Sequence, residues 1–200
     1  MNLSFLKKTV PNTADDFKVI TDKDGIRFLK SKDNIFSIRF SILNNFVSLP
    51  EVVNFNFIRL IYDLNPDVYE YVNVNISDNG EEAHFLVTMK HFFKDLGLPQ
   101  KYSSLHVTQT PYNSKLNTTE FYGKTTTTQK PPNLPNKAEL LPLQHMNIKC
   151  EFRSNHEVNF SVELIFEDNF SLLPMVEKLV GKILYKIFNN TKKFIQGLRP

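Results

Sequence analysis

The sequence has few of the residues on which several common protein classes depend. Its single cysteine excludes a disulfide framework, and its six scattered glycines form neither a phosphate-binding loop nor a Gly-x-Ser-x-Gly motif. Tryptophan is absent, and no stretch approaches the roughly 20 apolar residues of a membrane-spanning helix. The opening residues MNLSFLKKTV lack the apolar core of a signal peptide. We therefore expect an intracellular, soluble, cytoplasmic protein.

What the sequence does contain fits one globular domain. Its 200 residues are 41% hydrophobic and carry a net charge of +3. A chain of this length buries roughly 70% of its unfolded surface, so it needs neither a metal nor a disulfide to fold. Only five of the 24 basic residues are arginine, and no nucleic-acid recognition module is visible. We expect no nucleic-acid partner.

The first part of the chain divides into an arm, a strand and a helix. Residues 1–24 are polar and contain Pro11, and we interpret them as an N-terminal arm. Apolar and polar residues alternate over 36–42, which predicts a half-buried strand. Ser48-Leu49-Pro50-Glu51 is a helix-start signal, and apolar residues at helical spacing follow it as far as Asn65-Pro66.

A meander of strands follows the helix. Alternating patterns predict strands at 72–76, 85–93, 105–109 and 118–126. The Asp78-Asn79-Gly80 turn fits a hairpin between the first two, because Asn and Gly tolerate positive φ.

A proline-rich segment covers residues 125–143. It contains Pro131, Pro132, Pro135 and Pro142, which no regular element tolerates, so we predict a long loop. The residues after it contain too few elements for a second core. We therefore expect residues 25–200 to be a single α+β domain.

The last third of the chain has the clearest pattern. Strands are predicted at 146–152 and 158–166, joined by a turn at 153–156 into an antiparallel hairpin with one apolar face. Residues 171–196 have the apolar stripe of one long amphipathic helix, with Ser171 as its predicted cap. On the opposite side of this helix, lysines recur every four residues at Lys178, Lys182 and Lys186.

This order of elements resembles the START-like helix-grip superfamily, which includes lipid-transfer, polyketide-cyclase-like and coenzyme Q-binding proteins. The resemblance is carried by MNIKCEF, VNFSVELIFED and NFSLLPMVEKLVGKILYKIFNNTKKFI. It implies an antiparallel sheet wrapped on a long C-terminal amphipathic helix, with an apolar small molecule or lipid held between them. A β-sandwich or jelly roll with a C-terminal helix is the alternative fold. Large apolar residues could line such a ligand cavity, and our candidates are Phe57, Phe93, Phe160, Phe166, Leu184 and Phe188.

Candidate residues for catalysis or metal binding do not form a recognisable set. His84 and His91 are seven positions apart, which in a strand places them on opposite faces. Cys150 lies on the apolar face of a strand, and the acidic pairs, such as Glu81-Glu82, lie at turns. We assign no catalytic residue, metal ligand or cofactor. The sequence favours a noncatalytic binding module and leaves enzymatic activity open.

Two further hypotheses concern partners. The chain could be a structural or assembly subunit, for example of a virion, that contacts a protein partner or forms a homo-oligomer. The proline-rich segment and a composition typical of an A/T-biased genome motivate this alternative. The lysine face of the last helix could contact an anionic membrane peripherally. We expect these lysines mainly to face solvent, because the apolar stripe cannot serve both a core and a bilayer.

Overall fold

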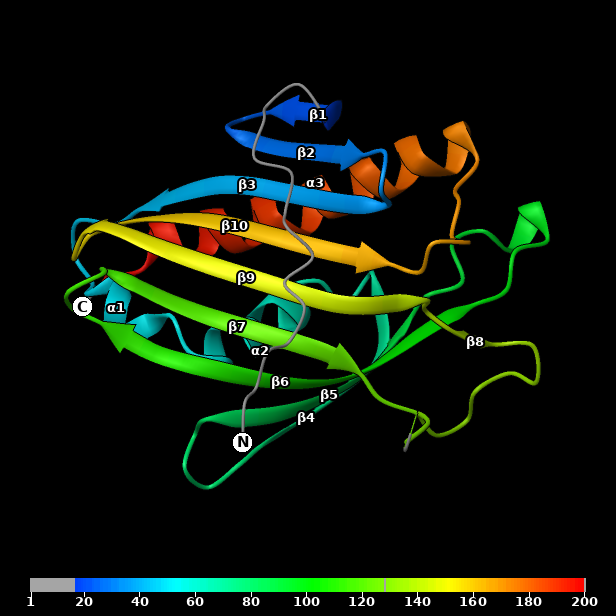
Figure 1. The fold of residues 1–200 in the computed structure, drawn as a ribbon, viewed down its shortest axis with the longest axis horizontal. Coiled ribbons are helices and arrows are strands. Elements are labelled where there is room, and N and C mark those ends of the chain that lie inside the picture. Colours follow the sequence, from blue (N-terminus) through cyan, green and yellow to red (C-terminus); the bar gives the residue numbers. More distant parts are fainter. Residues whose placement is uncertain (1–16, 128, 200) are drawn as a thin grey trace, which may run out of the picture.

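A ten-stranded sheet curves around a long helix in the computed structural model, which describes residues 17–127 and 129–199 (Figure 1). Neighbouring strands are antiparallel, except that the short β8 (Glu139–Leu140) pairs with β6 in parallel. From one edge to the other, the sheet runs β1 (Phe17–Lys23), β2 (Ile26–Ser31), β3 (Ile35–Leu43), β10 (Glu157–Phe166), β9 (Leu143–Ser154), β7 (Thr118–Thr125), β6 (Lys101–Asn113), β5 (Glu82–Met89) and β4 (Tyr69–Ile76).

The helices cover one face of this sheet. They are α1 (Leu49–Val52), α2 (Phe55–Asp63) and α3 (Pro174–Gly197), and a 3-10 turn, η2 (Lys94–Leu96), lies between β5 and β6. Figure 1 shows α3 running behind β2, β3 and β10. The opposite face of the sheet carries no helix in the described part of the chain.

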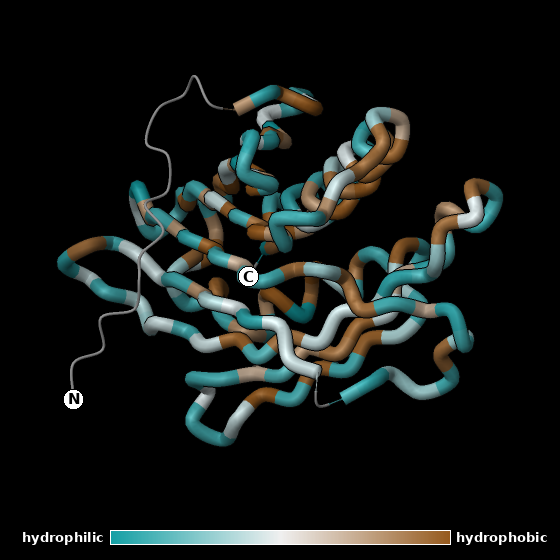
Figure 2. Tube along the Cα trace, turned by 45° about the vertical axis from the view of Figure 1, so that its right-hand side comes forward, coloured by the Kyte–Doolittle hydropathy of each residue, from teal (hydrophilic) through white to brown (hydrophobic). Residues whose placement is uncertain are grey.

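Alternation along the strands decides which face is buried. In β3 and β10, Phe40, Ile42, Val158 and Phe160 point to the helices and are nearly inaccessible. Arg39 and Ser41, which alternate with the inward residues of β3, are exposed. Figure 2 shows the same alternation as successive brown and teal positions along the chain. Burial of large apolar side chains on the helix side is the main stabilising contribution in this fold.

The structure confirms the two predicted hairpins, β4–β5 and β9–β10. Val158 to Leu164 of β10 pair with Phe152 to Met146 of β9, as the predicted terminal hairpin requires. The β4–β5 hairpin turns at Gly80, whose φ of 69° is the left-handed conformation that favours glycine. The sandwich and jelly-roll alternative is wrong, because all ten strands belong to one sheet.

Several boundaries differ from the prediction. β1 occupies the second part of the segment interpreted as an arm, while residues 1–16 lie outside the described residues. The expected helix after Ser48 is two helices, because the side chain of Asn54 accepts hydrogen bonds from the N–H groups of Asn56 and Phe57 and starts α2 anew. The start of α3 has no side-chain cap at Ser171; Leu173 occupies the cap position.

Two further differences lie near the proline-rich segment. β5 ends at Met89, so Phe93 does not continue the strand but lies in the turn before η2. The segment 125–143 contains β8, which is paired with Lys101 and Tyr102 of β6. No helix in the described part of the chain is long and apolar enough to cross a membrane.

Candidate functional site

The space between the sheet and the helices is lined by aromatic rings. The ring of Phe160 in β10 stacks on Phe40 of β3 at 4.7 Å and on Phe57 of α2 at 5.3 Å between centroids. Phe188 of α3 contacts Phe40 at 5.1 Å. The four rings join β3, β10, α2 and α3 in one cluster. Such contacts fix α3 and α2 on the sheet.

The structure brings together three of the six residues proposed to line a cavity. Phe57, Phe160 and Phe188 belong to this cluster and are almost inaccessible. Phe166 belongs to a second group at the other end of β10, where it contacts Phe36 at 5.4 Å and Phe170 at 4.4 Å. These four side chains are tightly packed core.

The other two predicted residues differ from the core. Phe93 contacts Phe92 at 6.5 Å in the turn that follows β5 and is not one of the buried core residues. Leu184 is directed at the core but only partly buried. It is therefore the one member of the predicted set that is both inward-facing and accessible.

Leu184 and Val180 are less buried than the inward residues before and after them on α3. Val176 and Ile187 are 2% and 3% exposed, as expected for the apolar stripe of a core helix. Val180 and Leu184 lie between them on the same stripe, yet both remain partly accessible. Because a helix advances 100° per residue, these two positions lie at the centre of the buried arc rather than at its border.

One inward position of the sheet is also only partly buried. Leu164 of β10 points inward between Val162 and Phe166, which are 5% and 8% exposed, but is itself only partly buried. Two inward tyrosines, Tyr62 at the end of α2 and Tyr69 at the start of β4, are also partly buried. We call Tyr62, Tyr69, Leu164, Val180, Ile183 and Leu184 the accessible inner set.

The sequence pattern identified part of this set. The alternation of β10 and the stripe of α3 place Leu164, Val180, Ile183 and Leu184 on the inner face. The two tyrosines were missed, because neither α2 nor the turn before β4 has a motif that singles them out. Incomplete burial has no sequence signal, since it depends on what lies across the core.

Polar contacts hold the start of α3 on the β1–β2 hairpin. The buried carboxylate of Glu177 lies 2.8 Å from Nζ of Lys30 and 3.4 Å from Nζ of Lys18. Burial acts to raise the pKa of Glu177, but the hydrogen bonds and charges of the two lysines outweigh it and leave the pKa lowered. Glu177 is therefore ionised and paired at neutral pH.

The end of α3 is held by two buried asparagines. Asn65 accepts a hydrogen bond from Nδ2 of Asn190 at 2.9 Å, and Asn44 donates from Nδ2 to the carbonyl oxygen of Ile195 at 2.5 Å. Lys186 forms an ion pair with Asp67, whereas Lys178 and Lys182 are exposed. Among the described residues, Lys186 thus has an ion-pair partner, whereas Lys178 and Lys182 have none.

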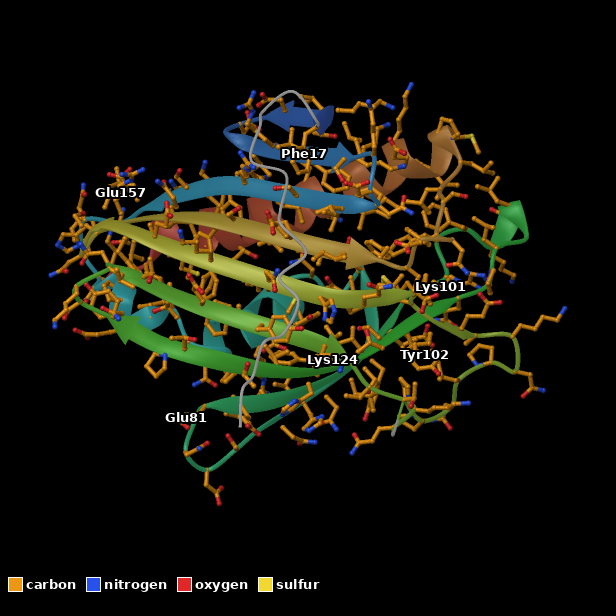
Figure 3. The ribbon with its side chains drawn as sticks, in the orientation of Figure 1. Phe17, Glu81, Lys101, Tyr102, Lys124 and Glu157 are labelled. Carbon is orange, nitrogen blue, oxygen red and sulfur yellow. The ribbon has the colours of Figure 1, made fainter. Side chains whose placement is uncertain are left out.

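Two hollows of about 470 and 400 Å³ lie away from the accessible inner set. The larger is lined by the η2 turn and residues 136–139, and the smaller by residues near the β6–β7 hairpin and β9. Figure 3 shows Lys101 and Tyr102 at the end of the sheet where the larger hollow lies. Neither hollow is lined by α3.

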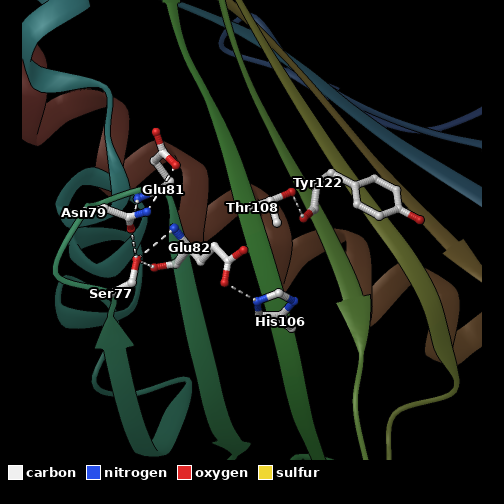
Figure 4. Close-up of polar contacts among 7 residues, drawn as sticks. All are labelled: Ser77, Asn79, Glu81, Glu82, His106, Thr108 and Tyr122. Carbon is white, nitrogen blue, oxygen red and sulfur yellow. Dashed lines mark hydrogen bonds and ion pairs between the residues drawn. The ribbon is translucent and has the colours of Figure 1, made fainter. Parts of the chain in front are cut away.

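The outer face of the sheet carries the neighbouring His84 and His106. His84 and His106 are cross-strand neighbours with ring centroids 4.7 Å apart, and Nε2 of His106 lies 3.2 Å from a carboxylate oxygen of Glu82 (Figure 4). His91 lies outside β5 and hydrogen-bonds the carbonyl oxygen of Leu98. Burial raises the pKa of the Cys150 thiol, which keeps it protonated and unreactive.

Comparison with known proteins supports the fold. No family model and no curated protein matches the sequence. The human StarD13 lipid transfer and protein localization domain is similar with a TM-score of 0.66 at 7% identity, over 91% of this chain and 90% of that one. Human StAR-related lipid transfer protein 5 gives 0.65 at 9% identity, over 92% and 88%.

A bacterial structure gives the same result. The STAR-related lipid transfer protein of Xanthomonas axonopodis has a TM-score of 0.63 at 9% identity, over 91% of this chain and 99% of that one. At such identities the likeness concerns the fold. This chain has the START-like helix-grip fold that its order of elements predicted.

Proposed function

We propose that the protein binds an apolar small molecule or lipid between the sheet and α3. One observation carries this proposal: the centre of the apolar stripe of α3, at Val180 and Leu184, is partly accessible although both ends of the stripe are closed. An apolar surface that points inward but is incompletely covered gains free energy when an apolar ligand covers it. The lipid-transfer titles of the similar structures support the same class of ligand.

The start of α3 is the proposed site of contact with a membrane. Leu173 and Met175 are 65% and 54% exposed, and Lys178 and Lys182 follow them on the helix. Apolar residues that can enter the headgroup region, next to lysines that attract anionic lipid, form a peripheral membrane contact. This refines the sequence-based hypothesis, since Lys186 is paired with Asp67. The comparisons give no support to the alternative of a structural or assembly subunit.

A single introduced tryptophan tests the ligand site. The chain contains no tryptophan, so Leu184→Trp provides a fluorophore on the inner stripe and Leu116→Trp, at a site 69% exposed, provides the matched control. The probe is the methyl ester of dibrominated stearate, whose bromine atoms quench tryptophan on contact. We expect saturable quenching of the residue at 184 and none at 116.

Equal quenching at both positions, or none at either, would contradict the proposal. Thermal melting of each variant shows whether it is folded. If Leu184→Trp unfolds the chain, native mass spectrometry of the unmodified protein mixed with the same ester replaces it. One bound ester per chain is then the expected result, and no bound ester counts against the proposal.

A further inference from the structure

Two partly buried tyrosines meet at the apolar core on the helix side of the sheet. Tyr62, near the end of α2, and Tyr69, at the start of β4, contact each other edge to face with ring centroids 4.9 Å apart. The ring of Tyr62 also packs on Phe85 of β5 at 5.9 Å. The pair therefore lies on the helix side of the sheet, in the accessible inner set.

Their hydroxyl groups have no hydrogen-bond partner among the described residues, unlike three tyrosines elsewhere. Tyr112 donates to Asn117 at 3.0 Å, Tyr122 bonds to His145 at 2.8 Å, and Tyr185 donates to Asp24. Within 17–127 and 129–199, the only fully enclosed side-chain oxygen or nitrogen atoms without a partner belong to Thr88 and Thr119. Among these residues, the hydroxyls of Tyr62 and Tyr69 thus have no protein partner and are not fully enclosed.

The partial burial of the pair affects the pKa of both phenols. Burial raises the pKa of Tyr62 to about 12 and raises the pKa of Tyr69 as well, with the neighbouring Tyr62 as the second cause. Both phenols are therefore neutral throughout the physiological range. Each offers one donor and one acceptor to whatever occupies the space beside it.

No buried charged group is free to join them. Among the described residues, Glu177 is the only buried side chain that carries a charge, and it is already paired with Lys30 and Lys18. An ionised carboxylate or phosphate would lose its hydration in this interior without gaining a counter-charge, which is strongly unfavourable. A neutral hydroxyl or carbonyl oxygen needs only hydrogen bonds, which phenols supply.

We infer that Tyr62 and Tyr69 bind the polar end of the interior ligand, and that this end is a neutral oxygen group such as a hydroxyl or carbonyl on an apolar body. A ligand with a charged end keeps that end at the surface. The inference rests on the proposed function, because it identifies the chemistry of the ligand that the same space holds.

The test compares a hydrocarbon probe with an alcohol. Diphenylhexatriene has no polar atom and fluoresces when it enters an apolar site, and 1-tetradecanol displaces it. In the double variant Tyr62→Phe/Tyr69→Phe we expect unchanged affinity for diphenylhexatriene and roughly tenfold weaker affinity for tetradecanol. Ionised myristate, with the same chain length, should compete weakly with the unmodified protein and be insensitive to the double substitution.

Tyr122→Phe is the matched control, because it removes a phenol hydroxyl from the outer face of the sheet (Figure 4). It should leave tetradecanol affinity unchanged. Both phenylalanine substitutions at the inner pair remove hydroxyls without protein partners, so melting temperatures should stay close to the unmodified value. Tetradecanol affinity that is equal in the unmodified protein and the double variant overturns the inference alone. Failure of the unmodified protein to bind either probe overturns the proposed function.

Discussion

The two halves of α3 differ in how completely they are buried. In the second half, Ile187 and Ile195 are 3% and 1% exposed, and Thr191 is completely buried. In the first half, Val180 and Leu184 occupy equivalent inward positions but stay partly accessible. One continuous helix therefore combines closed inward positions with inward positions that stay partly accessible.

The contacts of each half explain the difference. Asn44 and Asn65 reach backbone carbonyl groups of the second half, so the chain packs directly against the helix there. The first half is held from one side, by Glu177 on Lys30 and by the close approach of Gly181 to Thr21 of β1. A helix that is anchored along one side leaves the centre of its stripe available. Anchored positions and partly accessible positions therefore coexist in one helix.

Alanine substitution of two isoleucines one helical turn apart should give the largest difference in the free energy of unfolding. Ile187→Ala removes a fully buried side chain and should lower the free energy of unfolding by roughly 2–5 kcal/mol. Ile183→Ala removes a partly buried one and should cost less than about 2 kcal/mol. Urea denaturation of both variants measures the difference. Equal losses would mean that the first half is as closed as the second.

Two glycines of α3 test how closely the helix must approach β1. A Cβ at position 181 would lie 2.9 Å from Oγ1 of Thr21 and 3.1 Å from Cγ2 of Ile20, so Gly181→Ala should destabilise the domain by roughly 1–3 kcal/mol. Gly197→Ala meets no atom within 4 Å and should be neutral or slightly stabilising. Thermal melting distinguishes them. A stabilised Gly181→Ala would show that α3 does not need close contact with β1.

The Glu177 anchor should depend on pH. Its pKa in the folded state is lowered, so it contributes stability above the unfolded-state value of roughly 4.3 and loses that contribution as the pH falls through the folded-state value. Glu177→Gln should lower the free energy of unfolding by about 1–2 kcal/mol at pH 7. The gap from the unmodified protein should shrink toward pH 3. A gap that is the same at both pH values would contradict the ionic anchor.

The exposed lysines of the first half should have the smallest effect on folding. Lys178→Gln/Lys182→Gln should change stability by less than about 0.5 kcal/mol, because both side chains point to solvent. Binding to vesicles that contain phosphatidylserine should weaken roughly 30-fold. Lys115→Gln/Lys124→Gln, on exposed lysines outside α3, is the matched control. Equal vesicle binding by both double variants would place the membrane contact elsewhere.

Local pattern was sufficient to predict the fold class and most elements. The alternation of β9 and β10 and the stripe of α3 extend over many residues, so boundary errors of a few positions did not change their assignment. β1 was missed because its residues are mainly polar, and it pairs at the edge of the sheet where only part of the strand is buried. The break at Asn54 was missed because the apolar spacing continues across it.

The candidate site was less predictable for a physical reason. Hydrophobic periodicity indicates which side of an element faces the core, but packed and accessible positions on that side have the same pattern. Phe160 and Leu164 share one face of β10, and only the structure separates the buried ring from the partly accessible leucine. Tyr62 and Tyr69 come from different elements, and no spacing rule joins them.

Methyl-resolved NMR locates a bound ligand without altering the chain. The protein, labelled at Leu, Val and Ile methyl groups, is titrated with 1-tetradecanol. We predict saturable shifts for Leu164, Val180, Ile183 and Leu184, with little change at Leu116 or in the closed half at Ile187 and Ile195. Shifts confined to exposed residues, or no saturable shift at all, would contradict binding between the sheet and α3.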